Sequence, residues 1–132
     1  MPLRLDLKPN EKLFVGGAVL VNGDTRGTLM VLNDVPILRE KDILTEAEAN
    51  TPCKRIYLII QLMYMDQSQL AHYHQLYWAL VREVLAAAPS TTERIASISD
   101  DVLAGRYYHA LKLATDLIQY EKELVAHASQ PA

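Results

Sequence analysis

The feature that most constrains the fold is a change of periodicity along the chain. In about the first 44 residues, short apolar runs alternate with Gly, Asn, Asp and Pro, whereas from Asp66 apolar residues recur every three or four positions. A period of two with frequent turns predicts short antiparallel strands, and a period near 3.6 predicts amphipathic helices. We therefore expect an α+β protein: a small N-terminal antiparallel β lobe (sheet or partial barrel), then a C-terminal antiparallel lobe of two to three helices.

The strands of the expected β lobe are bounded by turn residues. Residues 3–8 alternate between leucine and polar side chains, which predicts a strand with one wet face. Asn22-Gly23-Asp24 contains the Asn-Gly pair that favours a tight hairpin, so residues 18–21 are expected to pair with residues 28–32. Gly16-Gly17 is interpreted as a turn, because the Lys and Ser/Thr of a phosphate-binding loop do not follow it.

The junction between the two lobes has two interpretations. Residues 55–60 are apolar and β-branched, so they form either a last strand or, with residues 61–65, the opening of a helix. Three segments are expected, namely a β-rich lobe over residues 1–62, a helical lobe over residues 63–128 and a frayed tail over residues 129–132.

Two capping boxes predict where helices begin in the second lobe. Asp66 with Gln69 is one, and Ser90-Thr91-Thr92-Glu93 is the other, placing a helix start near residue 91. Apolar residues at helical spacing over residues 107–125 predict a final helix.

Composition narrows the classes of partner. The net charge of −3 and the 22% of charged residues are ordinary for a globular domain, so we expect no DNA partner. The most apolar run, residues 56–65, is shorter than the ~20 residues of a membrane span, so it is expected in the core, with no membrane partner. The single cysteine, Cys53, excludes an intrachain disulfide, and the N-terminus lacks a secretion signal; both observations favour a cytoplasmic protein.

No catalytic or metal site is expected. His72 and His74 are two positions apart, and on a helix such side chains point about 200° apart, so they do not share one ion. His109 and His127 are remote from them, and no Ser/His/Asp or Cys/His set has a local signature. We therefore predict neither an enzyme nor a bound cofactor.

Several short motifs, in fixed order and spacing, span nearly the whole chain. They are Lys8-Pro9 with Glu11-Lys12, Asn22-Gly23-Asp24 with Arg26-Gly27, Leu38-Arg39-Glu40-Lys41-Asp42-Ile43, Thr51-Pro52, Tyr64 with Asp66, Tyr107-Tyr108 before Ala110-Leu111, and Leu117-Ile118 with Tyr120-Glu121. On these motifs the chain resembles the FlbT-type flagellin synthesis repressors of flagellated bacteria.

The resemblance implies a function after transcription. Proteins of that family associate with the 5′ untranslated leader of flagellin mRNA and promote its degradation, so the chain is expected to repress flagellin synthesis. An alternative is a protein-interaction adaptor that binds a flagellin, a flagellin-associated factor or an assembly component and affects the mRNA indirectly.

RNA binding requires cations that meet phosphates and flat groups that stack on bases. Tyr57 is a stacking candidate because it lies close to two basic residues. The alternating run of residues 39–42 also fits internal charge pairing, in which case a monomer binds RNA weakly and a homodimer or larger assembly is expected. The candidate RNA-binding residues are Arg4, Lys8, Lys12, Arg26, Arg39, Lys41, Lys54, Arg55 and Tyr57.

Three aromatic residues of the helical lobe are candidates for binding a protein partner. Tyr107 and Tyr108 open the last predicted helix, and Trp78 lies one position off the main apolar stripe of its helix. An exposed Trp is a favourable anchor in an interface, whereas core packing is the alternative for the tyrosines.

Overall fold

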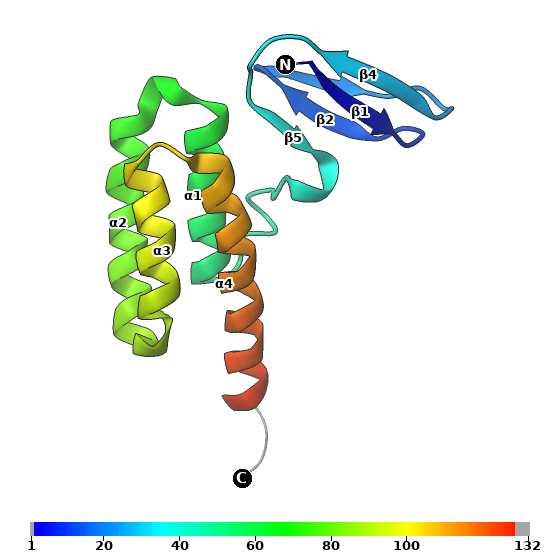
Figure 1. Ribbon diagram of the computed structural model, residues 1–132. Helices are drawn as coiled ribbons and strands as arrows, with labels where there is room; N and C mark the ends of the chain where they lie inside the picture. The colour runs from blue at the N-terminus through cyan, green and yellow to red at the C-terminus, as the bar shows by residue number, and fades with distance from the viewer. Residues whose placement is uncertain (1, 129–132) are drawn as a thin grey trace. The chain divides into compact units, whose positions relative to one another are not determined.

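The computed structural model describes residues 2–128 and divides them into two units, each with its own core (Figure 1). The β unit extends to Ile43, and the helical unit begins at Leu44. The expected α+β class is confirmed. The division nevertheless comes before the expected boundary at residue 62, because residues 52–65 form a helix. The predicted frayed tail, residues 129–132, lies outside the described residues.

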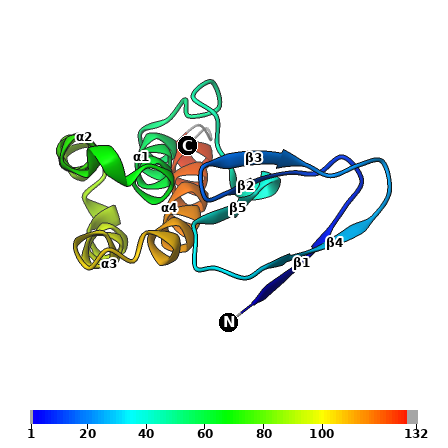
Figure 2. The ribbon, with the colours of Figure 1, turned by 90° about the horizontal axis from the view of Figure 1, so that it is seen from above.

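Two small antiparallel sheets make up the β unit (Figure 2). One sheet contains β1 and β4, and the other has the order β3-β2-β5. Leu5, Leu7, Leu13 and Val31 form the core between them. The strands are β1 (Leu3–Leu7), β2 (Lys12–Val15), β3 (Ala18–Val21), β4 (Gly27–Val31) and β5 (Ile37–Arg39).

The tight hairpin of the β unit lies at Gly16-Gly17, where both glycines have positive φ, +55° and +101°. It joins β2 to β3, and β4 pairs with β1, so the expected pairing across Asn22-Gly23-Asp24 is wrong. Neither Asn22 nor Gly23 has the positive φ of a type I′ turn. The Asn22 amide instead donates to the Lys8 carbonyl at 2.7 Å and to the Thr25 carbonyl at 3.0 Å, which fixes a longer loop.

The helical unit is an up-and-down bundle of four α-helices within the described residues, where two to three were expected. Seen from above in Figure 2, the helices occupy four corners. In the bundle α1 packs against α2 and α4, and α3 packs against α4. Within residues 2–128, none of the helices combines the length and the apolar character that a membrane span needs. The helices are α1 (Pro52–Met65), α2 (Leu70–Ala87), α3 (Thr92–Leu103) and α4 (Tyr107–Ala128).

The additional helix is α1, so the strand interpretation of residues 55–60 is wrong. The Thr51 side chain caps α1 by accepting from the Lys54 N–H at 3.2 Å, and proline stands in the first turn. The Glu121 carboxylate of α4 accepts from the Thr51 hydroxyl and from the Cys53 N–H, so a second side chain satisfies the same helix end. Tertiary packing of α1 thus overrides the β-propensity of its isoleucines.

The predicted helix starts in the second lobe are nearly right in position but differ in their hydrogen bonds. Asp66 accepts from the Ser68 N–H at 3.1 Å and caps the short 3₁₀ turn Gln67–Gln69, which precedes α2. At α3, the Thr91 side chain makes no cap bond and donates to the Ala88 carbonyl at 2.7 Å.

Candidate nucleic-acid interface

Hydrogen bonds gather three loops at one end of the β unit. The Asn10 N–H donates to the Gly23 carbonyl, and the Asn22 N–H donates to the Glu11 carbonyl, both at 2.8 Å. The Lys12 N–H donates to the Glu40 carboxylate at 2.7 Å. We call residues 8–12, 22–26 and 39–42 the loop cluster. It brings together five of the predicted RNA-binding residues, which are Lys8, Lys12, Arg26, Arg39 and Lys41.

Arg39 connects the loops of the loop cluster through an ion pair and hydrogen bonds. Its Nε lies 3.0 Å from Glu11 Oε2 and its Nη2 lies 2.9 Å from Glu11 Oε1, which is a bidentate pair. Nη2 also donates to the Asp6 carbonyl at 2.6 Å. The hydrogen bond from Arg39, with that from the Lys8 N–H, lowers the pKa of Glu11 from 4.5 to about 2. The internal-pairing interpretation therefore holds for Arg39, whose guanidinium is engaged within the protein.

A hollow of about 580 Å³ opens over this pair. Lys8 and Lys41 contribute cations to its wall, and Asp6, Glu11 and Glu40 contribute carboxylates. A surface of mixed charge binds a phosphate only where the cationic side chains extend beyond the carboxylates. The lysines without an ion-pair partner among the described residues are therefore better candidates for phosphate contacts than the hollow itself. The lining residues are Asp6, Lys8, Pro9, Asn10, Glu11, Arg39, Glu40 and Lys41.

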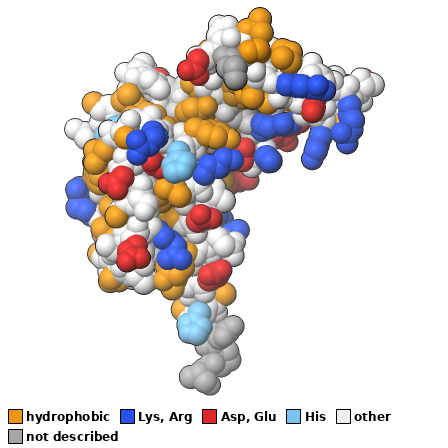
Figure 3. All heavy atoms as spheres, viewed as in Figure 1, with side chains coloured by type: hydrophobic (Ala, Val, Ile, Leu, Met, Phe, Trp, Pro, Cys, Tyr) orange, Lys and Arg blue, Asp and Glu red, His pale blue; other side chains and the backbone are white. Residues whose placement is uncertain are grey.

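The remaining cations of the β unit are exposed. Lys12, Arg26 and Lys41 have no side-chain hydrogen bond or ion pair with any described residue, and Lys8 interacts with Glu11 only at longer range. Figure 3 shows Lys and Arg side chains on the visible face of the β unit. Arg4 lies outside the loop cluster and pairs with Asp6 at 3.2 Å, but both side chains are more than 60% exposed, so this pair is weak.

The other candidates belong to the helical unit. Lys54 and Arg55 lie in the first turn of α1, where the Lys54 ammonium donates to Asn50 Oδ1 at 3.3 Å. Tyr57 is only 7% exposed, so the expectation that its ring is open to base stacking is wrong. Phe14, the one aromatic residue in the β unit, is 6% exposed. Any RNA contact at the loop cluster must therefore rest on phosphates rather than on stacked bases.

The candidates for a protein partner separate by burial. Tyr107 is 8% exposed, and its hydroxyl lies 3.2 Å from His74 Nε2, so the core interpretation applies to it. Trp78 is half-buried and packs edge-on against a neighbouring tyrosine ring. Tyr108 is 44% exposed, with its ring centroid 5.7 Å from that of Tyr64, and of the three it offers the most open surface.

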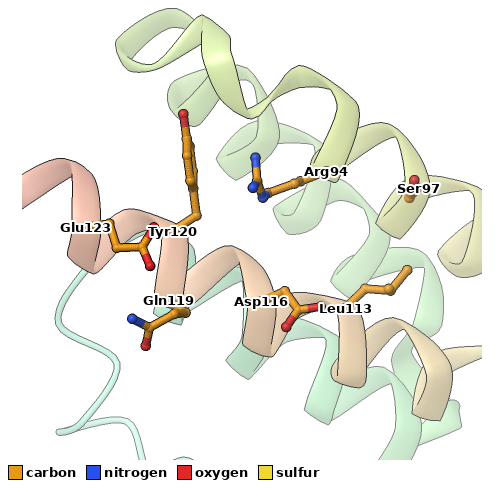
Figure 4. A pocket seen from close by; sticks show the side chains of 7 residues that line it. All are labelled: Arg94, Ser97, Leu113, Asp116, Gln119, Tyr120 and Glu123. Atoms are coloured by element: carbon orange, nitrogen blue, oxygen red, sulfur yellow. The ribbon is translucent and has the colours of Figure 1, made fainter.

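A second polar hollow, of about 350 Å³, lies between α3 and α4 (Figure 4). Its main feature is the Arg94 guanidinium, which stacks 3.9 Å from the centroid of the Tyr120 ring. The Tyr120 hydroxyl donates to Ser90 Oγ at 2.7 Å, and Asp116 and Glu123 line the α4 side. Sequence reasoning missed this contact, because no local pattern links residues on two different helices.

One more polar cluster closes the turn between α3 and α4. Asp101 is 4% exposed and accepts from Arg106 Nε at 2.9 Å and from the His109 ring. Burial raises the pKa of the Asp101 carboxyl, but these hydrogen bonds outweigh burial and hold the pKa below its usual range. Among residues 2–128, no three His, Cys, Asp or Glu side chains are grouped as they would be to hold a metal ion.

Comparison with known proteins gives consistent matches along the chain. A family model described as flagellar protein FlbT matches residues 3–125. The probable flagellum biosynthesis repressor protein FlbT of Rhodopseudomonas palustris (strain TIE-1) is 47% identical over 126 residues, which are 96% of this chain and 99% of that protein. The flagellum biosynthesis repressor protein FlbT of Caulobacter vibrioides (strain ATCC 19089) is 38% identical over 131 residues, 98% of this chain and 93% of that protein. No solved structure matches.

Proposed function

Because the chain belongs to the FlbT family of flagellar proteins, we propose that it regulates flagellum synthesis by associating with the 5′ untranslated leader of flagellin mRNA and promoting its degradation. The names of its relatives describe repressors of flagellum biosynthesis, not enzymes. The chain therefore contributes binding and no chemistry of its own in this proposal. Acting on mRNA also requires that the protein be cytoplasmic.

The loop cluster is the single observation that supports the proposed RNA contact most directly. Residues 1–43 contain six Lys/Arg and six Asp/Glu, so the β unit is neutral as a whole. Arg39 and Arg4 are engaged with acids, whereas the other cations extend from three adjoining loops. Local convergence, rather than net charge, supports phosphate binding here. The cations available to RNA are Lys8, Lys12, Arg26 and Lys41.

Four phosphate contacts would give only a modest affinity for RNA. Each phosphate neutralised on a single strand contributes about −0.7 to the slope of log K against log salt, so four contacts give a slope of about −3. The β unit has no exposed aromatic residue to add stacking energy, because Phe14 is buried. We therefore expect salt-sensitive RNA binding that is weak for one copy of the chain.

A charge-reversal variant tests the proposed face. Lys12→Glu/Arg26→Glu/Lys41→Glu removes three free cations and spares Arg39, whose loss would also damage the loop cluster. Binding is measured by fluorescence anisotropy of a labelled flagellin leader at several salt concentrations between about 50 and 200 mM. The variant should bind more than about tenfold less tightly than the wild type, and the slope of log K against log salt should flatten by about 2.

A matched control reverses the same number of charges, but on the helical unit. Arg82, Lys112 and Lys122 are exposed there, and reversing all three should leave leader binding within about threefold if long-range charge is screened at that salt. Equal loss of affinity in both variants would point to net charge and not to the loop cluster. Unchanged affinity in the first variant would contradict the proposed face.

A protein-interaction adaptor is the second candidate function, supported by an apolar groove of about 350 Å³ between α1 and α2. Arg55 and Glu83 flank the groove. An amphipathic helix of a flagellin or a flagellar assembly protein fits a groove of this chemistry. The same titration separates the candidates, because an adaptor binds no leader RNA even at low salt. The groove is lined by Arg55, Leu58, Ile59, Leu76, Ala79, Leu80 and Glu83.

A further inference from the structure

The edge strand β3 is apolar and uncovered. It ends the three-stranded sheet, because β2 separates it from β5. All four residues of Ala18–Val21 are exposed, with Val19 at 70%, Leu20 at 38% and Val21 at 61%. The unpaired N–H and C=O groups of an exposed, apolar edge strand are a ready template for another strand.

Soluble proteins usually protect such an edge with a lysine, a proline, a bulge or a covering loop. β3 contains no charged residue and no proline. Its four residues pair without interruption with β2, from Val15 opposite Ala18 to Lys12 opposite Val21, so no bulge twists the edge away. The opposite edge strand, β5, is only three residues long and ends at Arg39, which is engaged with Glu11.

The direction of the backbone groups of β3 follows from its pairing with β2. The Asn22 N–H donates inward to the Glu11 carbonyl, and in an antiparallel ladder the inward groups belong to every second residue. Leu20 therefore directs its N–H and C=O toward Leu13 of β2. Val19 and Val21 direct theirs away from the sheet, so the outer edge offers two donors and two acceptors.

We propose that two copies of the chain pair through β3, antiparallel about a two-fold axis at Leu20, to form one continuous six-stranded sheet. With Leu20 opposite its own counterpart, Val19 of each copy faces Val21 of the other. Both are outward-directed residues, so each of the two Val19–Val21 pairs exchanges two hydrogen bonds. Leu20 meets Leu20 in the intervening non-hydrogen-bonded pair, where side chains approach most closely.

Other registers are worse. A shift by one residue in one copy would put opposed side chains on different faces of the sheet. The neighbouring symmetric registers centre on Val19 or on Val21. The first pairs Val21 with Gly17, a turn residue at φ +101°, and the second pairs Val19 with Gly23, which lies beyond the strand. The Leu20 register is thus the one that pairs every outward-directed residue of β3 with another.

This symmetry favours a second copy over a foreign strand. The outward groups of Val19 and Val21 lie evenly on either side of Leu20, so the edge is complementary to itself. No charged side chain lies on β3, and pairing therefore puts no like charges opposite one another. The pairing does not require RNA, so it can fail or hold independently of the proposed function.

Paired substitutions test both the contact and its register. In Val19→Lys/Val21→Lys, lysines from the two copies stand directly opposite, whereas in Val19→Glu/Val21→Lys each glutamate faces a lysine. We expect the wild type and the Glu/Lys variant to be dimers in analytical ultracentrifugation, and the Lys/Lys variant to be a monomer. Met30→Lys/Leu32→Lys, which changes two residues that are 52% and 73% exposed on other parts of the β unit, should remain a dimer.

A wild-type protein that stays monomeric into the high micromolar range would overturn the proposal, and so would a Lys/Lys variant that still dimerises. A Glu/Lys variant that behaves as the Lys/Lys variant would overturn the register. A wild-type monomer that instead binds an apolar strand peptide with the spacing of β3 would identify a foreign strand as the occupant.

A symmetric crosslink gives a second readout. Cys53 is 3% exposed, so a cysteine placed on β3 is the only accessible thiol among the described residues. Leu20→Cys should form a disulfide-linked dimer under copper-phenanthroline oxidation, because the Cα atoms of a non-hydrogen-bonded pair lie about 4.5 Å apart, within the range of roughly 4.4–6.8 Å that a disulfide spans. Val19→Cys should crosslink much less, since Val19 faces Val21 rather than itself. Equal crosslinking of the two variants would contradict the two-fold axis at Leu20.

Discussion

Replacing Glu11 by Gln should destabilise the β unit in a pH-dependent way. Glu11 holds Arg39 through two hydrogen bonds, and its pKa is lowered from 4.5 to about 2. At about 1.4 kcal/mol for each pKa unit, this shift corresponds to at most about 3 kcal/mol. The side chains of Arg39 and Glu11 are 29% and 12% exposed. Because solvent screens a pair of this exposure, we expect a loss of about 1–2 kcal/mol for Glu11→Gln at pH 7.

The sign of the pH dependence is fixed by the direction of the pKa shift. A carboxyl whose pKa is lower in the folded state stabilises that state above pH 4.5, the ordinary pKa, and the stabilisation is lost as the pH falls toward 2. At pH 3 about two-fifths of the effect should remain. The free-energy difference between wild type and Glu11→Gln should therefore shrink on acidification rather than grow.

The assay must report on the β unit alone. All seven tyrosines and the single tryptophan lie from residue 57 onward, so fluorescence follows the helical unit. Urea unfolding followed by the amide NMR signals of β2 and β5 gives the required free energies. Asp34→Asn is the control, because Asp34 is exposed and has no side-chain partner among the described residues. A Glu11→Gln difference that is absent at pH 7, or unchanged at pH 3, would refute this account of the pair.

Three further predictions concern the helical unit. Glu121→Ala removes the acceptor of the Thr51 hydroxyl and the Cys53 N–H at the start of α1, and should cost about 1–2 kcal/mol in urea unfolding followed by tryptophan fluorescence. Burial raises the pKa of the Cys53 thiol to about 12, so Ellman's reagent should react with it only at the unfolding rate. Tyr77→Phe leaves the buried Ser99 hydroxyl without its 2.8 Å partner and should cost about 1–3 kcal/mol, while the double variant with Ser99→Ala costs less than the sum of the two single changes.

The periodicity of the sequence was sufficient for the fold class, and the reasons for the local errors are specific. Asn22-Gly23 carries the strongest hairpin signal in the chain, yet Gly16-Gly17 makes the hairpin. The Asn22 side chain can bond several carbonyls only when the loops of residues 8–12 and 22–26 adjoin. That long-range contact has no signature in a local pattern, so turn chemistry alone selected the wrong pair of residues.

The start of α1 does have a signal in the sequence. Thr51-Pro52 fits an N-cap followed by proline at the first helical position, and the structure uses both residues in this way. The isoleucines that follow favour a strand by propensity, and only packing against α2 and α4 decides otherwise. The candidate cations were likewise visible in the sequence, but which of them is free was not, because Arg39 is engaged by Glu11 from a distant loop.

The proposed dimer bears on the affinity of the proposed RNA contact. A neutral β unit with four free cations and no exposed aromatic residue offers few contacts to RNA, so the proposed RNA binding is weak for one copy of the chain. Residues 22–26 of the loop cluster follow Val21 directly, so antiparallel pairing through β3 puts these two loops at opposite ends of the paired segment. Four residues at about 3.4 Å each separate them by roughly 14 Å along the strands, which exceeds the Debye length of about 8 Å at physiological salt. Each cluster then acts as a separate phosphate site, and one leader that reaches both gains avidity and about twice the salt slope. Val21→Pro removes an outward N–H of β3 without adding charge and leaves the pairing with β2 intact. This variant should be a monomer and should bind RNA with about half the wild-type salt slope, whereas an unchanged slope would support the loop cluster but not the dimer.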